Sequence, residues 1–195
     1  MVQTPIQSAT VQPTPAMKVE EDYEANILSP DCYDEVPEGM EEVDGELVEK
    51  TYMTIQHGNA QANLSAEWRG YSRASQQKGK AYVEVLCRTQ SQKRRPDVAY
   101  VTEELHQEYG QPTTFPQSFP LIGEIASPDD SAERLFEKAY EYLASGAEEV
   151  WILLPEAKLA FIVVAEQVLA FSGEQEIATQ KVLKGFAIAL SELFA

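Results

Sequence analysis

The chain has 195 residues, 44% of them hydrophobic, and a formal net charge of −17. This length and composition fit one soluble globular domain with a tail. No apolar run approaches the roughly 18 residues of a membrane span, and the N-terminus lacks the basic start and apolar stretch of a secretory signal. Two cysteines without metal-ligand spacing, Cys32 and Cys87, argue against a zinc site and for a reducing compartment. We therefore expect a cytoplasmic protein that does not enter membranes.

The negative charge is unevenly distributed along the sequence. Residues 1–50 carry a net charge of −11, whereas the other 145 residues carry only −6. Between positions 69 and 95 the net charge is +7, because Glu84 is the only acidic residue among eight basic ones. A local basic patch bears on partners more than the total charge does, so nucleic acid is not excluded. The residues that we expect to meet a nucleic-acid backbone are Arg69, Arg73, Lys93, Arg94 and Arg95.

The N-terminal segment has a different composition from the rest of the chain. Pro, Thr, Gln and Glu dominate residues 1–30, where Tyr23 is the only aromatic residue. Such a segment cannot bury enough apolar surface to offset the entropy that ordering would cost. We predict a flexible tail over residues 1–30 and one folded domain over residues 31–195.

The first elements after the tail are predicted to be a hairpin and a long helix. The stretch "GMEEVDGELVEKTYM" reads as two short strands around a central Asp-Gly turn. Helical spacing follows over residues 54–76, where Ile55, Ala62, Trp68 and Tyr71 are expected near one face. Strands are then predicted over residues 81–87, 96–101 and 120–126.

The second half of the sequence predicts a loop, a helix and further strands. Residues 103–119 contain one Gly and two Pro and are predicted as a long loop. The next helix is predicted to have Asp130 as its N-cap, Glu133 as the capping-box partner, and a stop at Gly146. Strands follow over residues 149–155, 159–165 and 168–173, and "KGFAIALSELFA" closes the chain as a strand and a short helix.

This order of elements indicates the fold class. Two strands, a helix, three strands, a helix and four further strands predict an α/β domain. In such a domain helices flank a mixed central sheet, and the hairpins are additions to it.

Two acidic residues interrupt otherwise apolar strands: Asp97 in "PDVAYV" and Glu124 in "IGEIA". An unpaired carboxylate buried in a sheet costs several kcal/mol, so a partner or a ligand is expected for each. If the two strands pair, the carboxylates can meet at one end of the sheet, where they suit a hard cation such as Mg²⁺ or Mn²⁺. The alternatives are an ion pair of Asp97 with Arg94 or Arg95, and a metal-free ion pair of Glu124 with Lys138.

Lys138 is placed to reach this end of the sheet from the following helix. It falls about 100° from the centre of the apolar stripe of that helix. A long side chain in this position can run along the sheet and present its ammonium group at a strand end. The alternative is a solvated ion pair with Glu141, three positions further on.

Taken in order, these segments resemble a known family. "EEVDGELVE", a histidine on the next helix (His57), "RRPDVAYV", "GEIASPDD" and "EKAYEYLASGAEEVWILLP" follow the pattern of the Uma-two family of endonucleases. That family belongs to the restriction-endonuclease-like PD-(D/E)XK superfamily. The resemblance covers about residues 40–195 and implies a restriction-endonuclease-like fold with metal-dependent hydrolysis of DNA.

The resemblance also implies roles for individual residues. Asp97 matches the Asp of the PD motif and Glu124 the second acid, and both are metal ligands in the superfamily. The superfamily lysine normally stands two positions after that acid, where this chain has Ala126, and Lys138 looks like a lysine that has moved to the helix. Two further residues match recurrent positions with supporting roles: Glu46 and His57.

The function expected from the sequence is that of a Mg²⁺-dependent endonuclease acting on DNA. Asp97 and Glu124 would hold the metal, and Lys138 would orient the attacking water or stabilise charge on phosphorus. By analogy with restriction-like enzymes that cut two strands, we expect a homodimer. A catalytically inactive nuclease-fold protein that serves as a binding or assembly module is the alternative, and a hydrolase of a non-nucleic phosphoester is a third candidate.

Overall fold

The computed structural model describes residues 36–50 and 53–195. The predicted tail over residues 1–30 lies outside the described residues.

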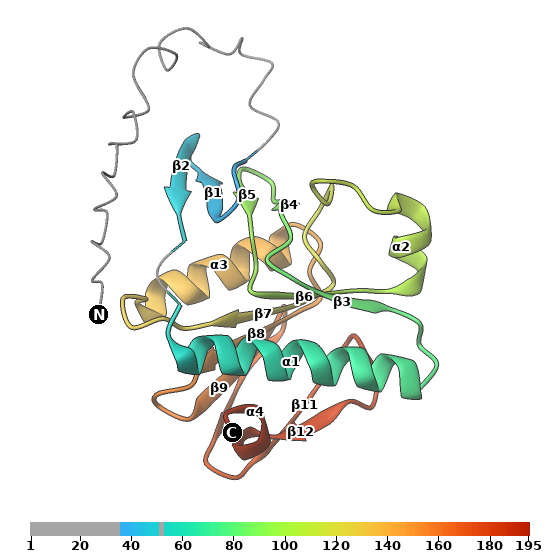
Figure 1. Cartoon of the computed structure of the whole chain (residues 1–195), viewed down its shortest axis with the longest axis vertical. Helices are drawn as coiled ribbons and strands as arrows, with labels where there is room; N and C mark the ends of the chain where they lie inside the picture. The colour runs from blue at the N-terminus through green and yellow to red at the C-terminus, as the bar shows by residue number, and fades with distance from the viewer. Residues whose placement is uncertain (1–35, 51–52) are drawn as a thin grey trace, which may run out of the picture. The chain divides into compact units, whose positions relative to one another are not determined.

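A six-stranded mixed sheet forms the centre of the domain (Figure 1). Its strand order is β10-β9-β8-β7-β6-β3, and neighbouring strands are antiparallel except for the parallel pair β7 and β8. The strands are β3 (Lys80–Val83), β6 (Val98–Val101), β7 (Leu121–Ile125), β8 (Glu149–Leu154), β9 (Leu159–Val164) and β10 (Gln167–Ser172). The predicted α/β fold with a mixed central sheet is therefore confirmed.

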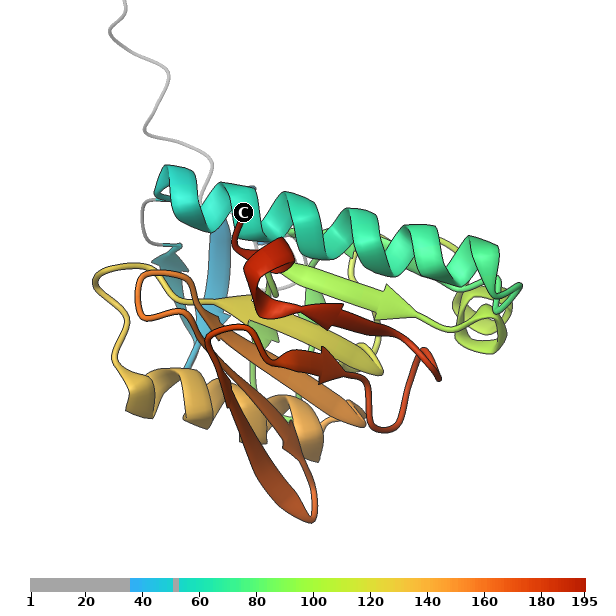
Figure 2. The same ribbon diagram turned by 90° about the horizontal axis from the view of Figure 1, so that it is seen from below.

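Two helices cover opposite faces of this sheet (Figure 2). On one face lies α1 (Ile55–Ala74), and on the other lies α3 (Ala132–Ala144), which connects the parallel strands β7 and β8. One hydrophobic core lies between the sheet and α1, and the other lies between the sheet and α3. The residues that these two helices bury in the cores are Ala60, Leu64 and Trp68 of α1 and Leu135, Ala139 and Tyr142 of α3.

Helix α1 confirms the predicted element but not its predicted buried face. Thr54 caps it by accepting a hydrogen bond from the N–H of His57. Trp68 is buried as expected, whereas Ile55 is 93% exposed and Ala62 is also exposed. The buried face follows i, i+4 spacing from position 60 to Trp68, so the helix is rotated relative to the predicted stripe.

Gly123 in β7 lets α1 pack closely against the sheet. A Cβ atom at this position would lie 2.5 Å from Cδ2 of Leu64, which real Cβ atoms do not tolerate. Side chains of β7 alternate between the two faces, so Leu121 and Ile125 enter the α1 core and Ile122 enters the α3 core. Glu124 therefore points toward α3.

A second, four-stranded sheet has the order β2-β1-β5-β4. Its first two strands form the predicted hairpin, in which Asp44 and Gly45 both take positive φ (54° and 80°), as a type I′ turn requires. The hairpin joins β5 through the pairing of Glu42 with Lys93. The strands are β1 (Met40–Val43), β2 (Glu46–Glu49), β4 (Cys87–Arg88) and β5 (Lys93–Arg94).

The C-terminal segment forms a strand and a short helix, as predicted. Strands β11 (Glu176–Ala178) and β12 (Ala187–Ala189) pair with each other, and helix α4 (Leu190–Leu193) follows. The buried carboxylate of Glu149 accepts hydrogen bonds from the backbone N–H groups of Gln180 and Lys181 and so fastens the connecting loop.

The strand predicted over residues 81–87 is interrupted. β3 ends at Val83 because Glu84 takes a left-handed conformation, with φ at 55°. The chain turns there and contributes Cys87 and Arg88 to the second sheet instead. This turn also directs the side chain of Glu84 toward the end of β6.

Two predictions about helices are wrong. The predicted loop 103–119 contains a short helix, α2 (Glu103–Tyr109), which Thr102 caps by accepting a hydrogen bond from a backbone N–H group. Ser131, not Asp130, is the N-cap of α3. Asp130 instead accepts a hydrogen bond from the N–H of Ser127, in the turn that follows β7.

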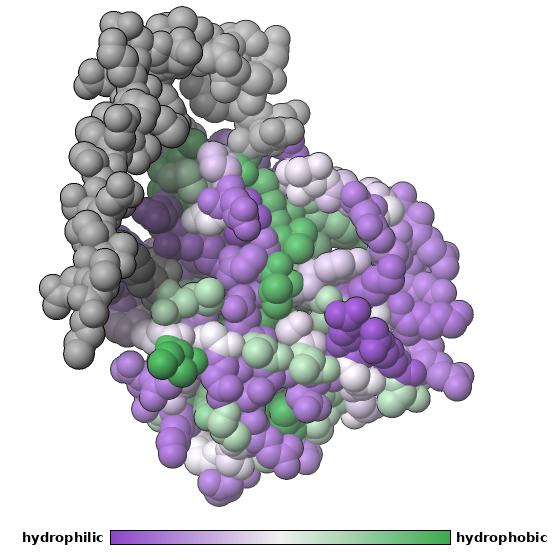
Figure 3. Space-filling view, viewed as in Figure 1, coloured by the Kyte–Doolittle hydropathy of each residue, from purple (hydrophilic) through white to green (hydrophobic). Residues whose placement is uncertain are grey.

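The face of the molecule seen in Figure 3 is mostly hydrophilic, with apolar residues scattered between polar ones. Within residues 36–50 and 53–195, none of the helices combines the length and the hydropathy needed to cross a bilayer.

Candidate active site

A cavity of about 900 Å³ opens beside one end of the central sheet. The β1–β2 hairpin, the start of α1, the ends of β6 and β7, and α3 all contribute to its walls. Asp97, Glu124, Lys138 and His57 all line it, so the structure brings four of the predicted residues together.

Asp97 stands immediately before β6 and is buried. Its Oδ1 accepts a hydrogen bond from Nζ of Lys50 at 2.7 Å, and its Oδ2 accepts one from the N–H of Ile125 at 2.7 Å. Burial by itself would raise the pKa of Asp97, but the contact with the His57 ring and the charge of Lys50 outweigh it and hold the pKa well below its ordinary value. Asp97 is therefore an ionised carboxylate.

Glu124 lies next to Asp97 across the paired strands, because Val98 of β6 pairs with Gly123 of β7. Its carboxylate is buried, and Oε1 accepts a hydrogen bond from the hydroxyl of Tyr142 at 2.8 Å. Burial raises the pKa of Glu124 from 4.5 to about 7, and Lys138 only partly counteracts this. Glu124 therefore keeps its proton to a higher pH than an exposed glutamate does.

Lys138 reaches the cavity from α3, as predicted. Its Nζ lies 3.6 Å from Oε2 of Glu124 and 3.6 Å from Oε2 of Glu41. Burial would lower the pKa of Lys138, but these two carboxylates raise it above its ordinary value. Lys138 is therefore a cation shared between two acids, and the alternative ion pair of Glu124 with Lys138 is formed. Among the described residues Glu141 pairs with Arg94 and not with Lys138.

Sequence reasoning missed Lys50, which follows β2. Its Nζ donates to Oε2 of Glu84 at 2.7 Å, to Oδ1 of Asp97 at 2.7 Å and to the carbonyl oxygen of Arg95 at 2.8 Å. Burial would lower its pKa, but the surrounding carboxylates raise it. Nothing in the local sequence marks Lys50, because its partners come from a turn and a strand 34 to 47 positions further along.

Glu41 and Glu84 are also absent from the predicted set. The side chain of Glu41 is buried, and its Oε1 accepts a hydrogen bond from the N–H of Arg95 at 2.9 Å. Glu84 is held by Lys50 and by Nε2 of Gln61, which also donates to the carbonyl of Asp97. A carboxylate in the hairpin was expected, but the structure places Glu41 in the cavity and leaves Glu46 exposed on β2, outside the cavity lining.

His57 is buried at the start of α1. Its Nδ1 shares a hydrogen bond with Oγ of Ser127 at 3.2 Å, and its Nε2 lies 3.5 Å from Oδ1 of Asp97. The histidine thus connects α1 with the carboxylate end of the sheet.

The basic residues before β6 make contacts inside the protein. Lys93 donates to Glu42 at 2.9 Å, and Arg94 donates to Glu141 at 2.7 Å. Nη1 of Arg95 donates to the carbonyl oxygen of Glu84 at 2.8 Å. Arg94 and Arg95 still line the cavity, whereas Lys93 does not.

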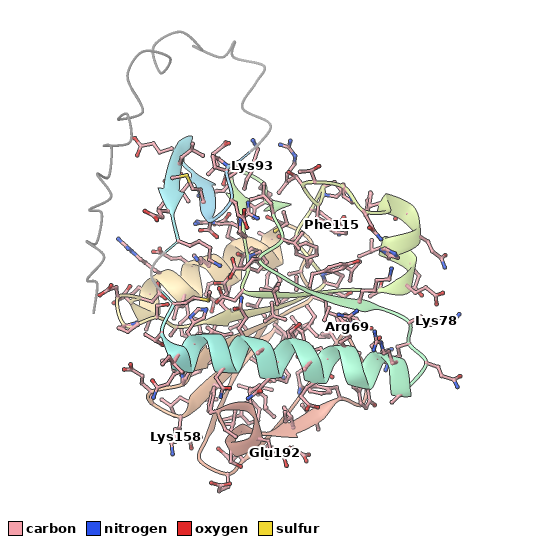
Figure 4. The ribbon with its side chains drawn as sticks, viewed as in Figure 1. Arg69, Lys78, Lys93, Phe115, Lys158 and Glu192 are labelled. Carbon is pink, nitrogen blue, oxygen red and sulfur yellow. The ribbon has the colours of Figure 1, made fainter. Side chains whose placement is uncertain are left out.

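Arg69 and Arg73 lie on the exposed side of α1 and do not line the cavity. Figure 4 shows Arg69 beside α1 and Lys93 beside the second sheet, at separate places on the molecule. The predicted basic residues therefore do not form one continuous patch.

The charged residues of the cavity lining are acidic in excess. Eight are acidic: Glu38, Glu41, Glu49, Glu84, Asp97, Glu124, Asp130 and Glu137. Five are basic: Lys50, Arg94, Arg95, Arg134 and Lys138. An anionic phosphodiester would be repelled by this lining unless a further cation were present.

The donor set fits a hard cation such as Mg²⁺. Across residues 36–50 and 53–195, no three His, Cys, Asp or Glu side chains come together as a metal cage. Mg²⁺ does not need such a cage, because it is usually bound by one or two carboxylates together with water and substrate phosphate. Asp97 and Glu124 are two such carboxylates, both buried and next to each other where β6 pairs with β7.

A family model described as "Uma2: Putative restriction endonuclease" matches residues 28–191 of this chain. The match spans both sheets and every residue of the cavity lining. No curated protein matches the chain.

Among solved structures, the chain is similar to the crystal structure of a putative nuclease belonging to DUF820 from Anabaena variabilis ATCC 29413. The alignment has a TM-score of 0.72 at 17% identity and covers 80% of this chain and 89% of that chain. At this identity the likeness shows the shared fold.

Proposed function

Because the chain belongs to the Uma2 family of restriction-endonuclease-like proteins, we propose that it is a divalent-cation-dependent endonuclease that hydrolyses DNA. The observation that supports this most is the pair of buried carboxylates in one cavity, Asp97 just before β6 and Glu124 in the adjacent strand β7. The ammonium group of Lys138, 3.6 Å from Glu124, completes the set.

Asp97 and Glu124 are the residues that would hold Mg²⁺ or Mn²⁺. When bound, such a cation polarises a phosphoryl oxygen and lowers the pKa of a coordinated water. Tyr142 fixes the orientation of Glu124 through its hydroxyl, and the N–H of Ile125 fixes that of Asp97. The two acceptors are thus held in place before any ligand arrives, which is what electrostatic catalysis requires.

Lys138 supplies a positive charge that is not a metal ligand, because an ammonium group has no lone pair to donate. Shared between Glu41 and Glu124, it stays charged beside a carboxylate that would hold the metal. In this position it orients the attacking water or stabilises the negative charge that develops on phosphorus.

Binding of DNA requires attraction to its phosphates. Arg95 and Arg94 line the cavity, and Arg69 and Arg73 are exposed on α1. These residues give sequence-independent contacts to the backbone, together with the bound cation. A homodimer would bring two such cavities to the two strands of a duplex, and light scattering at micromolar concentration tests that assembly.

The second candidate is a catalytically inactive nuclease-fold protein that binds a partner or supports an assembly. The acidic excess of the cavity lining favours it, because acids that stay without a divalent ion repel nucleic acid. The ion pairs of Lys93 and Arg94 with carboxylates of the same chain point in the same direction.

Hydrolysis of supercoiled plasmid, compared with hydrolysis of a chromogenic phosphodiester, separates these functions. We expect nicking of the plasmid in Mg²⁺ or Mn²⁺ and none in EDTA. Cleavage of the small diester with intact plasmid would instead indicate a hydrolase of a non-nucleic phosphoester. If the folded protein hydrolyses neither the plasmid nor the small diester in the presence of metal, the catalytically inactive candidate is indicated.

A further inference from the structure

The ammonium group of Lys50 occupies a position built from three oxygens. Oε2 of Glu84, Oδ1 of Asp97 and the carbonyl oxygen of Arg95 surround it at 2.7, 2.7 and 2.8 Å. Two carboxylates and a carbonyl form a donor set of the kind that hard divalent cations also use. The ammonium group of Lys50 therefore occupies a position whose three oxygens would also suit a metal cation.

Three separate segments converge to hold this group. Lys50 ends the β1–β2 hairpin, Glu84 stands at the left-handed turn after β3, and Asp97 precedes β6. The side chain of Lys50 is only 18% exposed and that of Asp97 only 3%. An ammonium group fixed by three acceptors in such a place is not displaced as readily as one on a flexible surface chain.

We propose that Lys50 serves as the resident second cation of the carboxylate centre, so that the centre binds one divalent ion rather than two. Two-metal nuclease centres hold their ions about 3.5–4 Å apart around shared carboxylates. Here Lys50 already shares Asp97, and a second divalent ion on the same side of Asp97 would meet its positive charge. The inference rests on the proposed function, because it concerns the metal that Asp97 and Glu124 would hold.

Substitutions distinguish the cation position that Lys50 occupies from the one that Asp97 and Glu124 would form. Lys50→Met keeps the length of the side chain and removes its charge, so Glu84 and Asp97 become available to a second ion. Glu84→Gln in the same chain removes one of the two acids of that position but leaves Glu124 intact. Lys50→Gln, which keeps a hydrogen-bond donor, serves if the Met variant does not fold.

The experiment is calorimetric titration of the whole protein with MnCl₂ at about 0.15 M salt, where weak surface binding is screened equally in every variant. We expect one tight Mn²⁺ per chain in the wild type, two in Lys50→Met and one in the Lys50→Met, Glu84→Gln double variant. Mn²⁺ should also raise the melting temperature of Lys50→Met by more degrees than that of the wild type. Circular dichroism establishes that each variant is folded before titration.

Other results overturn the inference. Two tight Mn²⁺ ions in the wild type, or one in both the wild type and the folded Lys50 variant, would show that Lys50 does not exclude a second ion. A wild type that binds no Mn²⁺ would contradict the proposed function. In that case one ion gained by Lys50→Met would still uphold the role of Lys50 as a resident cation, and none gained would overturn it.

Discussion

Asp97 and Glu124 lie side by side, yet the protein shifts their pKa values in opposite directions. Asp97 has Lys50 at 2.7 Å and the N–H of Ile125 at 2.7 Å, so its charged form is favoured. Glu124 has a hydroxyl at 2.8 Å but its nearest ammonium group, that of Lys138, only at 3.6 Å. One acid of the pair is thus satisfied by the chain itself, and the other is not.

This contrast predicts how stability changes with pH in metal-free buffer. The pKa of Glu124 is about 7 in the folded protein, whereas its ordinary value, which applies to the unfolded chain, is 4.5. Between pH 4.5 and pH 7 the folded protein therefore holds a proton on Glu124 that the unfolded chain has released. Stability therefore falls as the pH rises from about 4.5 to about 7. Glu124→Gln should match the wild type near pH 4.5 and exceed it at pH 8 by about 1–3 kcal/mol, measured by thermal unfolding.

Asp97→Asn is the control for this measurement. It removes the charge that Lys50 needs, so it should lower the melting temperature at pH 8 instead of raising it. A wild type that is more stable than Glu124→Gln at pH 8 would mean that Glu124 is a structural ion-pair partner and that no cation is missing.

Lys138 is predicted to act in catalysis without holding the metal. Lys138→Ala should leave the Mn²⁺ affinity within a few-fold, because an ammonium group is not a ligand. It should slow plasmid nicking by roughly 10²-fold or more, as when one transition-state stabiliser is removed. Nicking at the wild-type rate, in an assay where Glu124→Gln is inactive, would rule out this role.

The close approach of α1 to β7 brings the start of the helix near the two carboxylates. Gly123 precedes Glu124 and lies under Leu64 and Trp68. His57, at the start of the same helix, reaches Asp97. The packing of one helix against one glycine thus sets the distance between α1 and both acids.

Gly123→Ala tests this packing. The added Cβ would lie 2.5 Å from Leu64, and the overpacked core should lose about 1–3 kcal/mol of stability. Gly70→Ala is the matched control, because nothing lies within 4 Å of its Cβ position on α1. The control should gain up to about 1 kcal/mol from helix propensity, as chemical denaturation would show. Equal stability of both variants would contradict the close approach.

The sequence predicted those elements whose cause is local. The type I′ turn, the alternation in the strands and the length of α1 follow from neighbouring residues, and so does the conflict of Asp97 and Glu124 with their apolar strands. Helix α2 could have been found as well, because Thr102 precedes two acidic residues at a helix start.

The contribution of the hairpin to the site could not be predicted in the same way. It depends on the pairing of β1 with β5, which joins residues 51 positions apart in the chain. That pairing brings Glu41 and Lys50 to the cavity and turns Glu46 away from it. The sequence of the hairpin does not show which of these three residues enters the cavity, because all of them lie beside the same turn.

Negative charge constrains how an anionic substrate can reach the cavity. The chain carries −17, and the cavity itself is lined by more acids than bases. A phosphodiester can approach such a centre only when a cation compensates for the acids. The acidic balance therefore favours a nuclease that depends on a divalent ion over one that does not.

The N-terminal tail is expected to be dispensable for folding. Deletion of residues 1–25 should leave the melting temperature within about 1–2 °C, because this segment offers little apolar surface for burial. Differential scanning calorimetry of the two proteins checks this. A loss of many degrees would show that the tail contributes to the packed structure.

Asp97 and Glu124 are proposed to hold the divalent ion on which cleavage of DNA depends, and a Mg²⁺ titration of plasmid nicking tests this claim. The proteins to compare are the wild type, Glu124→Gln and the matched control Glu192→Gln, whose side chain is exposed on α4 far from the hairpin (Figure 4). We predict nicking that saturates with Mg²⁺ in the wild type and in the control, and a rate at least about 10²-fold lower in Glu124→Gln at every Mg²⁺ concentration. Nicking by Glu124→Gln at the wild-type rate and with the same Mg²⁺ dependence would contradict the claim.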